Sequence, residues 1–195
     1  GSVADYQGEL RYHGSLIAPV ANRITGAKAV IDGATRRFEA NQAGDITLHS
    51  GEAGTHLKVW RIADAGPAHV TLTLTLSDGE GGFPGTRHVT ATYALHDEAT
   101  LRLDIHATTD APTLFNAVNH SYWNLDGTAD WSGHTLRVSA DHYLPGTPDF
   151  TPTGEIAATG GTQYDFTIAR PITPSNPPLD TCFCLANRRG PLRDV

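Results

Sequence analysis

Apolar and polar residues alternate with a period of two through the middle of the chain. The run HVTLTLTL alternates valine or leucine with threonine, and RHVTATYAL and TLRLDIHATTD repeat the alternation. Successive side chains of a strand point to opposite faces, so this pattern predicts half-buried β-strands over 70–76, 89–95 and 101–107. The break HDEA between the last two runs predicts a hairpin turn, and GHTLRVSA predicts a further strand around 136–138.

The spacing of turns favours an all-β fold. No window keeps apolar residues at helical spacing for three turns, and 20 Gly and 12 Pro divide the chain at short intervals. Many short strands with such turns are typical of antiparallel sheets packed face to face in a sandwich. We interpret the Pro-rich ARPITPSNPPLD as a connection that crosses between sheets rather than as a domain boundary. One domain over residues 1–195 is therefore expected.

Composition and charge limit the partners. The chain has 195 residues, 39% of them hydrophobic, and a formal net charge of −7 with 14 basic residues scattered singly. This balance argues against nucleic acid or an acidic membrane face as the main partner. No apolar run approaches the roughly 18 residues of a membrane span, and no secretory signal is visible. We expect a cytoplasmic protein, and the sequence does not indicate its oligomeric state.

Two cysteines, Cys182 and Cys184, are separated by one residue. In an extended strand they share a face but diverge along it, which is poor geometry for a disulfide. No further ligand lies nearby in sequence to complete a metal site with them. Two buried thiols in a reducing cytoplasm are therefore expected.

The ten histidines differ in their sequence context. No pair has the HxH or HxxxH spacing with a carboxylate that indicates a metal site. Eight lie in polar strand faces or turns, where a surface or hydrogen-bonded structural role is expected: His13, His56, His69, His88, His96, His106, His134 and His142. The other two are His49, which leaves an apolar run and enters the Gly-rich turn of LHSGEAG, and His120, which lies within VNHSYWN.

The stretch NAVNHSYWNLDG, residues 116–127, crowds polar and aromatic groups into one short run. The residues that would share one face of an extended strand are Val118, His120, Tyr122 and Asn124. The opposite face would hold Asn119, Ser121 and Trp123. Periodicity alone leaves open whether the first face meets a ligand or belongs to a buried polar network.

Three further polar residues lie where a side chain can meet a ligand. Asn22 and Arg23 follow a proline in PVANRITG, and a guanidinium presents several donors in one plane, which suits a hydroxyl-rich ligand as well as a carboxylate. Asp180 precedes the apolar run TCFCL, where capping a turn is the alternative role. The sequence contains no GxSxG nucleophile motif and no GxGxxG or GxxxxGK[ST] phosphate motif.

Taken in order, these motifs resemble those of the aldose 1-epimerase (galactose mutarotase) family. The similarity extends over nearly all of the chain, and its most specific pieces are NHSYWNLDG and YLPGTPDFTPTGEI. The resemblance implies an all-β, galactose mutarotase-like supersandwich of antiparallel sheets. It also implies an enzyme that interconverts the α and β anomers of a free hexose and needs no cofactor and no metal.

The chemistry of ring opening explains the residue types that the resemblance implies. The ring oxygen gains a proton while the anomeric hydroxyl loses one, so a general acid and a general base flank the sugar, a task that suits histidine. By motif, His120 matches the family's proton donor to the ring oxygen, and His49 matches a second histidine that binds and helps to polarise the sugar. The sugar-contacting positions are matched by Asn22, Arg23, Tyr122 and Asp180. Trp123 is expected to pack behind this polar face.

The sequence also departs from the family pattern. The family's general base is a glutamate beyond the LDTCFCL segment, and a stretch before DYQGELRYHG is part of the pattern too, so we expect the fold to be incomplete at both ends. The absence of Met and the end at GPLRDV agree with this expectation. LHSG stands where LHGG is frequent, and Thr181 stands where His is common. Glu155 belongs to a different motif and is not assigned as the base.

Two alternatives remain open beside the epimerase. One is a non-catalytic carbohydrate-binding module of the same fold, which keeps the cleft without the base. The other is a hexose-6-phosphate epimerase, which would need a basic cluster at the mouth of the cleft that this acidic chain does not obviously supply. The sequence does not reveal which aldose is preferred.

Overall fold

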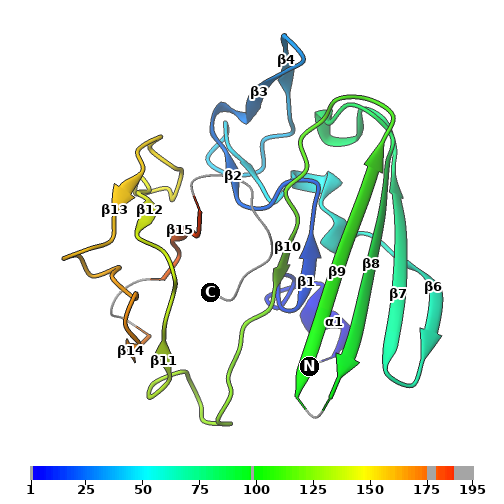
Figure 1. The fold of residues 1–195 in the computed structure, drawn as a ribbon. Helices are drawn as coiled ribbons and strands as arrows, with labels where there is room; N and C mark the ends of the chain where they lie inside the picture. The colour runs from blue at the N-terminus through cyan, green and yellow to red at the C-terminus, as the bar shows by residue number, and fades with distance from the viewer. Residues whose placement is uncertain (1, 98, 175–178, 187–195) are drawn as a thin grey trace. The chain divides into compact units, whose positions relative to one another are not determined.

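The computed structural model describes residues 2–97, 99–174 and 179–186 (Figure 1). Its regular elements are nearly all β-strands, and among the described residues the one α-helix is α1 (Val3–Tyr6). This confirms the all-β prediction. Glu98 of the expected hairpin, residues 175–178 and the C-terminal GPLRDV lie outside the described residues.

The chain forms two compact units, Gly1–Ser121 and Tyr122–Val195. The strand ladders inside both units are antiparallel, as expected. A single domain over 1–195 stays a prediction. Within the described parts of the chain, no helix is both long and apolar enough to cross a membrane.

One antiparallel sheet dominates the first unit, with the strand order β6-β7-β8-β9 (Figure 1). Its strands are β6 (Arg61–Gly66), β7 (His69–Leu76), β8 (Arg87–His96) and β9 (Thr100–Thr109). The last three contain the predicted strands 70–76, 89–95 and 101–107. The pairing of His96 with Thr100 confirms the hairpin between β8 and β9.

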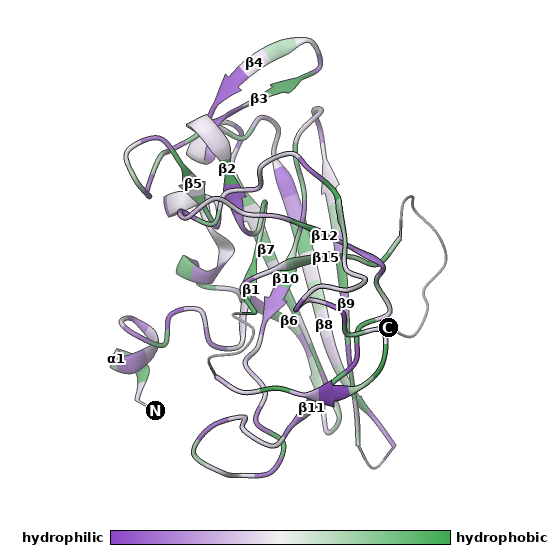
Figure 2. Ribbon diagram, turned by 90° about the vertical axis from the view of Figure 1, so that its left-hand side faces the viewer, coloured by the Kyte–Doolittle hydropathy of each residue, from purple (hydrophilic) through white to green (hydrophobic). Residues whose placement is uncertain are grey.

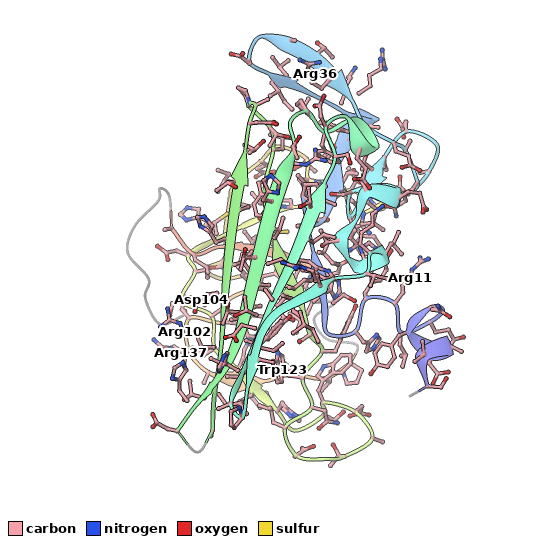
Figure 3. The ribbon with its side chains drawn as sticks, turned by 90° about the vertical axis from the view of Figure 1, so that its right-hand side faces the viewer. Arg11, Arg36, Arg102, Asp104, Trp123 and Arg137 are labelled. Carbon is pink, nitrogen blue, oxygen red and sulfur yellow. The ribbon has the colours of Figure 1, made fainter. Side chains whose placement is uncertain are left out.

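The strands of this sheet contain both hydrophobic and hydrophilic residues (Figure 2), and these residues differ in exposure. Val89 and Ala91 of β8 are buried, whereas Arg102 and Asp104 of β9 lie on an exposed face, with 2.7 Å between Arg102 Nε and Asp104 Oδ2 (Figure 3). The alternation fades at the hairpin, where Leu101 is 47% exposed although its register predicts an inward side chain.

Shorter strands build the rest of the first unit. The paired strands are β1 (Ser15–Ile17) with β10 (Val118–His120), β2 (Arg23–Ile24) with β5 (Thr47–Leu48), and β3 (Lys28–Ile31) with β4 (Ala34–Arg37). The described residues of this unit also form four 3₁₀ turns, of which the last lies between β7 and β8: η1 (Thr25–Ala27), η2 (Gly51–Ala53), η3 (Thr55–Leu57) and η4 (Glu80–Gly82).

A small apolar core joins these turns to the strands. Ile31, Phe38, Ala53 and Phe83 form it, and the rings of Phe38 and Phe83 stack with their centroids 4.5 Å apart. Burying aromatic rings in this way contributes substantially to the stability of a unit of this size. Because Ala53 lies in η2, this core fixes the turn that follows His49.

A buried arginine fixes the loop between β7 and β8. Arg87 is 1% exposed, and its guanidinium donates to the carbonyl oxygens of Phe83 at 2.6 Å and Ser77 at 2.7 Å. Burial lowers the pKa of Arg87, while the charges of Glu80 and two aspartates oppose that shift. The loop is thus tied to the sheet by hydrogen bonds to a charged group, which are stronger than neutral ones.

The described residues of the second unit form two small sheets. The strands are β11 (Thr135–Leu136) paired with β14 (Arg170–Pro171), and β12 (His142–Leu144) between β13 (Ala157–Ala158) and β15 (Cys182–Cys184). β11 ends before Val138, so the strand predicted there is shorter than expected. The segment ARPITPSNPPLD contains β14 of one sheet and leads to β15 of the other, so it passes between sheets as predicted. Cys182 and Cys184 are thiols and are half-buried rather than fully buried.

Candidate active site

The strand that carries His120 ends at that residue. The side-chain oxygen of Asn119 accepts hydrogen bonds from the main-chain nitrogen of Ser121 at 3.0 Å and from its hydroxyl at 2.6 Å. Such a local side-chain turn competes with the strand ladder. The predicted extended face from Val118 to Asn124 is therefore wrong beyond His120. Trp123, expected to pack behind that face, is 63% exposed.

Pairing of β1 with β10 brings an N-terminal tyrosine to His120. Ser15 lies opposite His120 in the register, and the nitrogen of Gly14 donates to the carbonyl oxygen of His120 at 3.2 Å. Tyr12 precedes this pair and its carbonyl accepts from Ser15 at 3.1 Å. The rings of Tyr12 and His120 consequently stack, with 5.5 Å between centroids and 24° between planes.

Two buried hydroxyls hold the loop that carries His49. Ser50 Oγ accepts from the nitrogen of Val20 at 2.8 Å and donates to its carbonyl at 2.9 Å. Thr55 Oγ1 accepts from the nitrogen of Ala18 at 2.9 Å and donates to the carbonyl of Leu16 at 2.6 Å. Both hydroxyls bond the same stretch of main chain, so the loop over residues 49–57 is fixed at both ends.

The backbone of this loop is left-handed where it leaves β5. His49 has φ 52° and Ser50 has φ 67°. Residues other than glycine adopt this region at a cost of the order of 1–2 kcal/mol each, and such positions concentrate at functional sites. The conformation is retained because the hydroxyl of Ser50 and the core around Ala53 both hold the loop.

The result is a compact group of rings, here called the imidazole cluster: Tyr12, His49, His56 and His120. Tyr12 contacts all three histidines, with centroid distances of 4.9 Å to His49, 5.3 Å to His56 and 5.5 Å to His120. His49 and His120 meet edge to face at 5.3 Å. The two histidines singled out in the sequence are therefore neighbours in the first unit.

Asn22 holds His49 in one protonation form. The main-chain nitrogen of Asn22 donates to Nδ1 of His49 at 3.0 Å, and the main-chain nitrogen of His49 donates to the carbonyl oxygen of Asn22 at 3.0 Å. Because Nδ1 accepts a hydrogen bond, the proton of the neutral ring lies on Nε2. His49 thus presents an N–H donor at its other nitrogen.

The surroundings of His49 keep it neutral. Burial, followed by the charges of His120, His56, Arg23 and Arg11, lowers the pKa of His49 from 6.5 to about 4. Burial disfavours the imidazolium because the charged form loses hydration, and nearby positive charges repel it. At neutral pH His49 is therefore a hydrogen-bond donor without charge.

His56, like Tyr12, is a residue of the cluster that the sequence analysis did not single out. Burial lowers its pKa, Arg11 and His120 lower it further, and Glu52 opposes them. Its Nδ1 is buried without a hydrogen-bond partner in the described structure. The surface or hydrogen-bonded role expected for His56 stays a prediction, since the residue is only half-buried. His69 and His88 do bond side chains, Asp64 and Thr75 respectively.

Arg23 is oriented by two amide side chains. Its Nε donates to Oε1 of Gln42 at 2.9 Å, and its Nη1 donates to Oδ1 of Asn22 at 3.2 Å. Arg23 also lies opposite Leu48 in the β2–β5 ladder, one residue before His49. The guanidinium is therefore held near His49, whose pKa its charge lowers. The predicted role of Asn22 and Arg23 in binding a sugar stays a prediction.

Tyr122 and Asp180 belong to the second unit. Tyr122 is 59% exposed and follows the end of β10, and Asp180 is exposed two residues before β15. Their convergence with the imidazole cluster stays a prediction. Within residues 2–97, 99–174 and 179–186, no group of three His, Cys, Asp or Glu residues is placed to hold a metal ion.

Comparisons with known proteins agree with the motifs. The family model described as Aldose 1-epimerase matches residues 1–195. The aldose 1-epimerase of Escherichia coli (strain K12) is 34% identical over 168 residues, 86% of this chain and 48% of that protein. The galactose mutarotase of Homo sapiens is 35% identical over 176 residues, 87% of this chain and 49% of that protein.

A solved structure extends the similarity to the fold. The GalM/aldose epimerase homologue from C. elegans matches with a TM-score of 0.82 and 29% identity, over 88% of this chain and 52% of that chain. The predicted galactose mutarotase-like all-β fold is confirmed. The chain spans about half the length of the curated relatives it matches.

Proposed function

The chain belongs to the aldose 1-epimerase family, and from this premise we propose that its imidazole cluster acts on the anomeric centre of a free hexose. The reaction is interconversion of the α and β anomers through the open-chain aldehyde. The observation that carries the proposal is the pair His49 and His120, whose rings meet at 5.3 Å while one of them is held neutral.

The proposed reaction requires a general acid and a general base, one to donate a proton and one to accept it. His120 donates a proton to the ring oxygen as the bond from that oxygen to the anomeric carbon breaks, and a general base accepts the proton of the anomeric hydroxyl as the aldehyde forms. Rotation about the adjacent carbon–carbon bond and ring closure on the other carbonyl face invert the centre. No general base is assigned among the residues discussed above.

His49 would serve as a neutral donor rather than as an acid. Its Nε2–H can hydrogen-bond a sugar oxygen on which negative charge grows, and a donor fixed in advance needs no reorganisation during the reaction. A neutral histidine used in this way is an established catalytic arrangement. Arg23, Asn22, Tyr122 and Asp180 are proposed to bind sugar hydroxyls.

Optical rotation tests this proposal. Freshly dissolved α-galactose or α-glucose should reach its equilibrium rotation faster with the protein than in buffer alone. A sugar that binds, shown by calorimetry, without faster equilibration would reject the epimerase in favour of the carbohydrate-binding module. Faster equilibration of glucose 6-phosphate than of glucose would instead favour the phosphosugar alternative.

A further inference from the structure

His56 is placed against the catalytic candidates by a rigid turn. It lies in η3, where the neighbouring Thr55 is fully buried and bonded to the main chain of Leu16 and Ala18. The indole nitrogen of Trp60 donates to the carbonyl oxygen of Thr55 at 3.1 Å and closes the turn. The position of the His56 ring therefore follows from an anchored backbone.

The turn also makes room for this ring. A methyl group added at Gly54 would lie 2.6 Å from Nδ1 of His56 and 2.7 Å from the carbonyl oxygen of His49. Real side chains essentially never approach so closely, so the imidazole occupies the space that a side chain at Gly54 would fill. Gly54 thus couples the placement of His56 to the backbone of His49.

The ring of His56 has hydrogen-bonding capacity that the described structure does not use. Its Nδ1 is buried without a partner, which costs about 1–3 kcal/mol for a polar group. Buried polar atoms in folded proteins are nearly always paired, and each exception needs an explanation, such as strain, a bound water or ion, or a catalytic role. With Nδ1 enclosed against Gly54, Nε2 is the ring nitrogen that a ligand can reach.

The proposed function supplies a ligand rich in hydroxyl groups beside this ring. His56 contacts Tyr12, which contacts both His49 and His120, and the charge of His120 acts on His56. A neutral imidazole can bind a hydroxyl group, because one of its nitrogens donates a hydrogen bond and the other accepts one. Burial and Arg11 lower the pKa of His56 and favour that neutral form.

We propose that His56 is a further substrate-binding residue, which hydrogen-bonds one hydroxyl of the aldose through Nε2 and so contributes to the choice between epimers. The inference rests on the proposed function, since it needs a sugar at the imidazole cluster. Its role is binding rather than proton transfer, so it should act on KM and leave kcat nearly unchanged.

The test replaces His56 with phenylalanine, which keeps a flat ring against Tyr12 and above Gly54 but removes both nitrogens. His56→Phe should raise KM by about 2- to 10-fold, the loss expected for one hydrogen bond between neutral groups. His56→Gln should recover part of the loss. His106→Phe, the same change at an exposed position of β9, is the matched control and should leave KM unchanged.

A panel of deoxy-aldoses identifies the contact. On the sugar that lacks the contacted hydroxyl, wild type and His56→Phe should have equal KM, while they differ on the others. Equal KM on every sugar would overturn the proposal. If the wild type does not accelerate mutarotation, the same comparison is made by calorimetric affinity: weaker binding by His56→Phe still supports the contact, and equal or undetectable binding rejects it.

Discussion

At the scale of single residues, the protonation of His49 has two independent causes. One is geometric, because Nδ1 accepts the main-chain N–H of Asn22 and cannot take a proton without breaking that bond. The other is electrostatic, because burial and four neighbouring positive or protonatable groups disfavour the imidazolium. Both causes lie within the first unit.

We predict that the His49 ring stays neutral from pH 8 to well below pH 6. Its pKa of about 4 should appear as a titration midpoint near that pH in the nitrogen-15 shifts of the ring, with the proton on Nε2 above it. A midpoint at pH 6 or higher, or a proton on Nδ1, would show that the bond from Asn22 does not persist in solution.

The same shift couples stability to pH. An unfolded histidine takes up its proton near pH 6.5, whereas folded His49 does so near pH 4, so the unfolded state binds more protons between these values. The free energy of unfolding should therefore fall as the pH drops from about 6.5 to about 4, with His56 acting in the same direction. Urea denaturation should give His49→Gln a shallower fall than wild type, and parallel curves would contradict the assignment.

At the scale of elements, the loop over residues 49–57 explains a departure from the family pattern. LHSG has Ser50 where the resemblance leads one to expect glycine, and the structure gives that residue a left-handed φ of 67°. Its hydroxyl makes two hydrogen bonds to Val20, which offset the backbone cost. Glycine would adopt this conformation without strain, whereas serine adopts it because the hydrogen bonds of its hydroxyl offset the strain.

Two substitutions at Ser50 separate these effects. Ser50→Ala loses both hydrogen bonds and keeps the strained backbone, so we predict that it destabilises the protein by about 2 kcal/mol. Ser50→Gly loses the same bonds but relieves the strain, and it should cost about 1 kcal/mol less than Ser50→Ala. Denaturant midpoints measure both, and a glycine variant less stable than the alanine variant would contradict this account.

Gly54 provides a test of the geometry of the same loop. Gly54→Ala places a methyl group within 2.6 Å of the His56 ring, so it should lower the thermal midpoint by an amount that corresponds to about 1–3 kcal/mol, and it should raise KM by displacing His56. Gly160→Ala is the control, because no atom lies within 4 Å of the added methyl group there. Equal stability of the two variants would show that the loop adapts without cost.

The sequence predicted the long strands well and the short ones poorly. β8 and β9 follow from alternation because their two faces differ in burial over several residues. β7 follows from the same sequence pattern, although its residues from Val70 to Leu74 are all half-buried. β10 does not, because the Asn119 side chain ends the strand by a local turn that no period of two reveals. The predictions that Trp123 packs inward and that a strand extends to Val138 are wrong for the same reason. Local hydrogen bonds and neighbouring segments decide where a strand ends.

At the scale of the whole molecule, the imidazole cluster joins residues that are far apart in the chain. Tyr12, His49, His56 and His120 meet through the β1–β10 ladder and the hydroxyl anchors of the loop. The motifs identified His49 and His120, but Tyr12 and His56 carry no motif, and only long-range pairing brings them to the site. The local sequences ELRYHG and GEAGTHL indicate turns, but they do not indicate which residues those turns bring together.

The central claim is that this cluster opens the sugar ring, and exchange between anomeric protons at equilibrium tests it most directly. Two-dimensional exchange NMR of galactose should show α–β cross-peaks that grow faster with the protein than in buffer. His120→Gln should reduce that added rate by about 10²- to 10⁴-fold, the usual contribution of a proton-transfer group, while His106→Gln leaves it unchanged. A His120→Gln protein that exchanges the anomers at the wild-type rate would contradict the account.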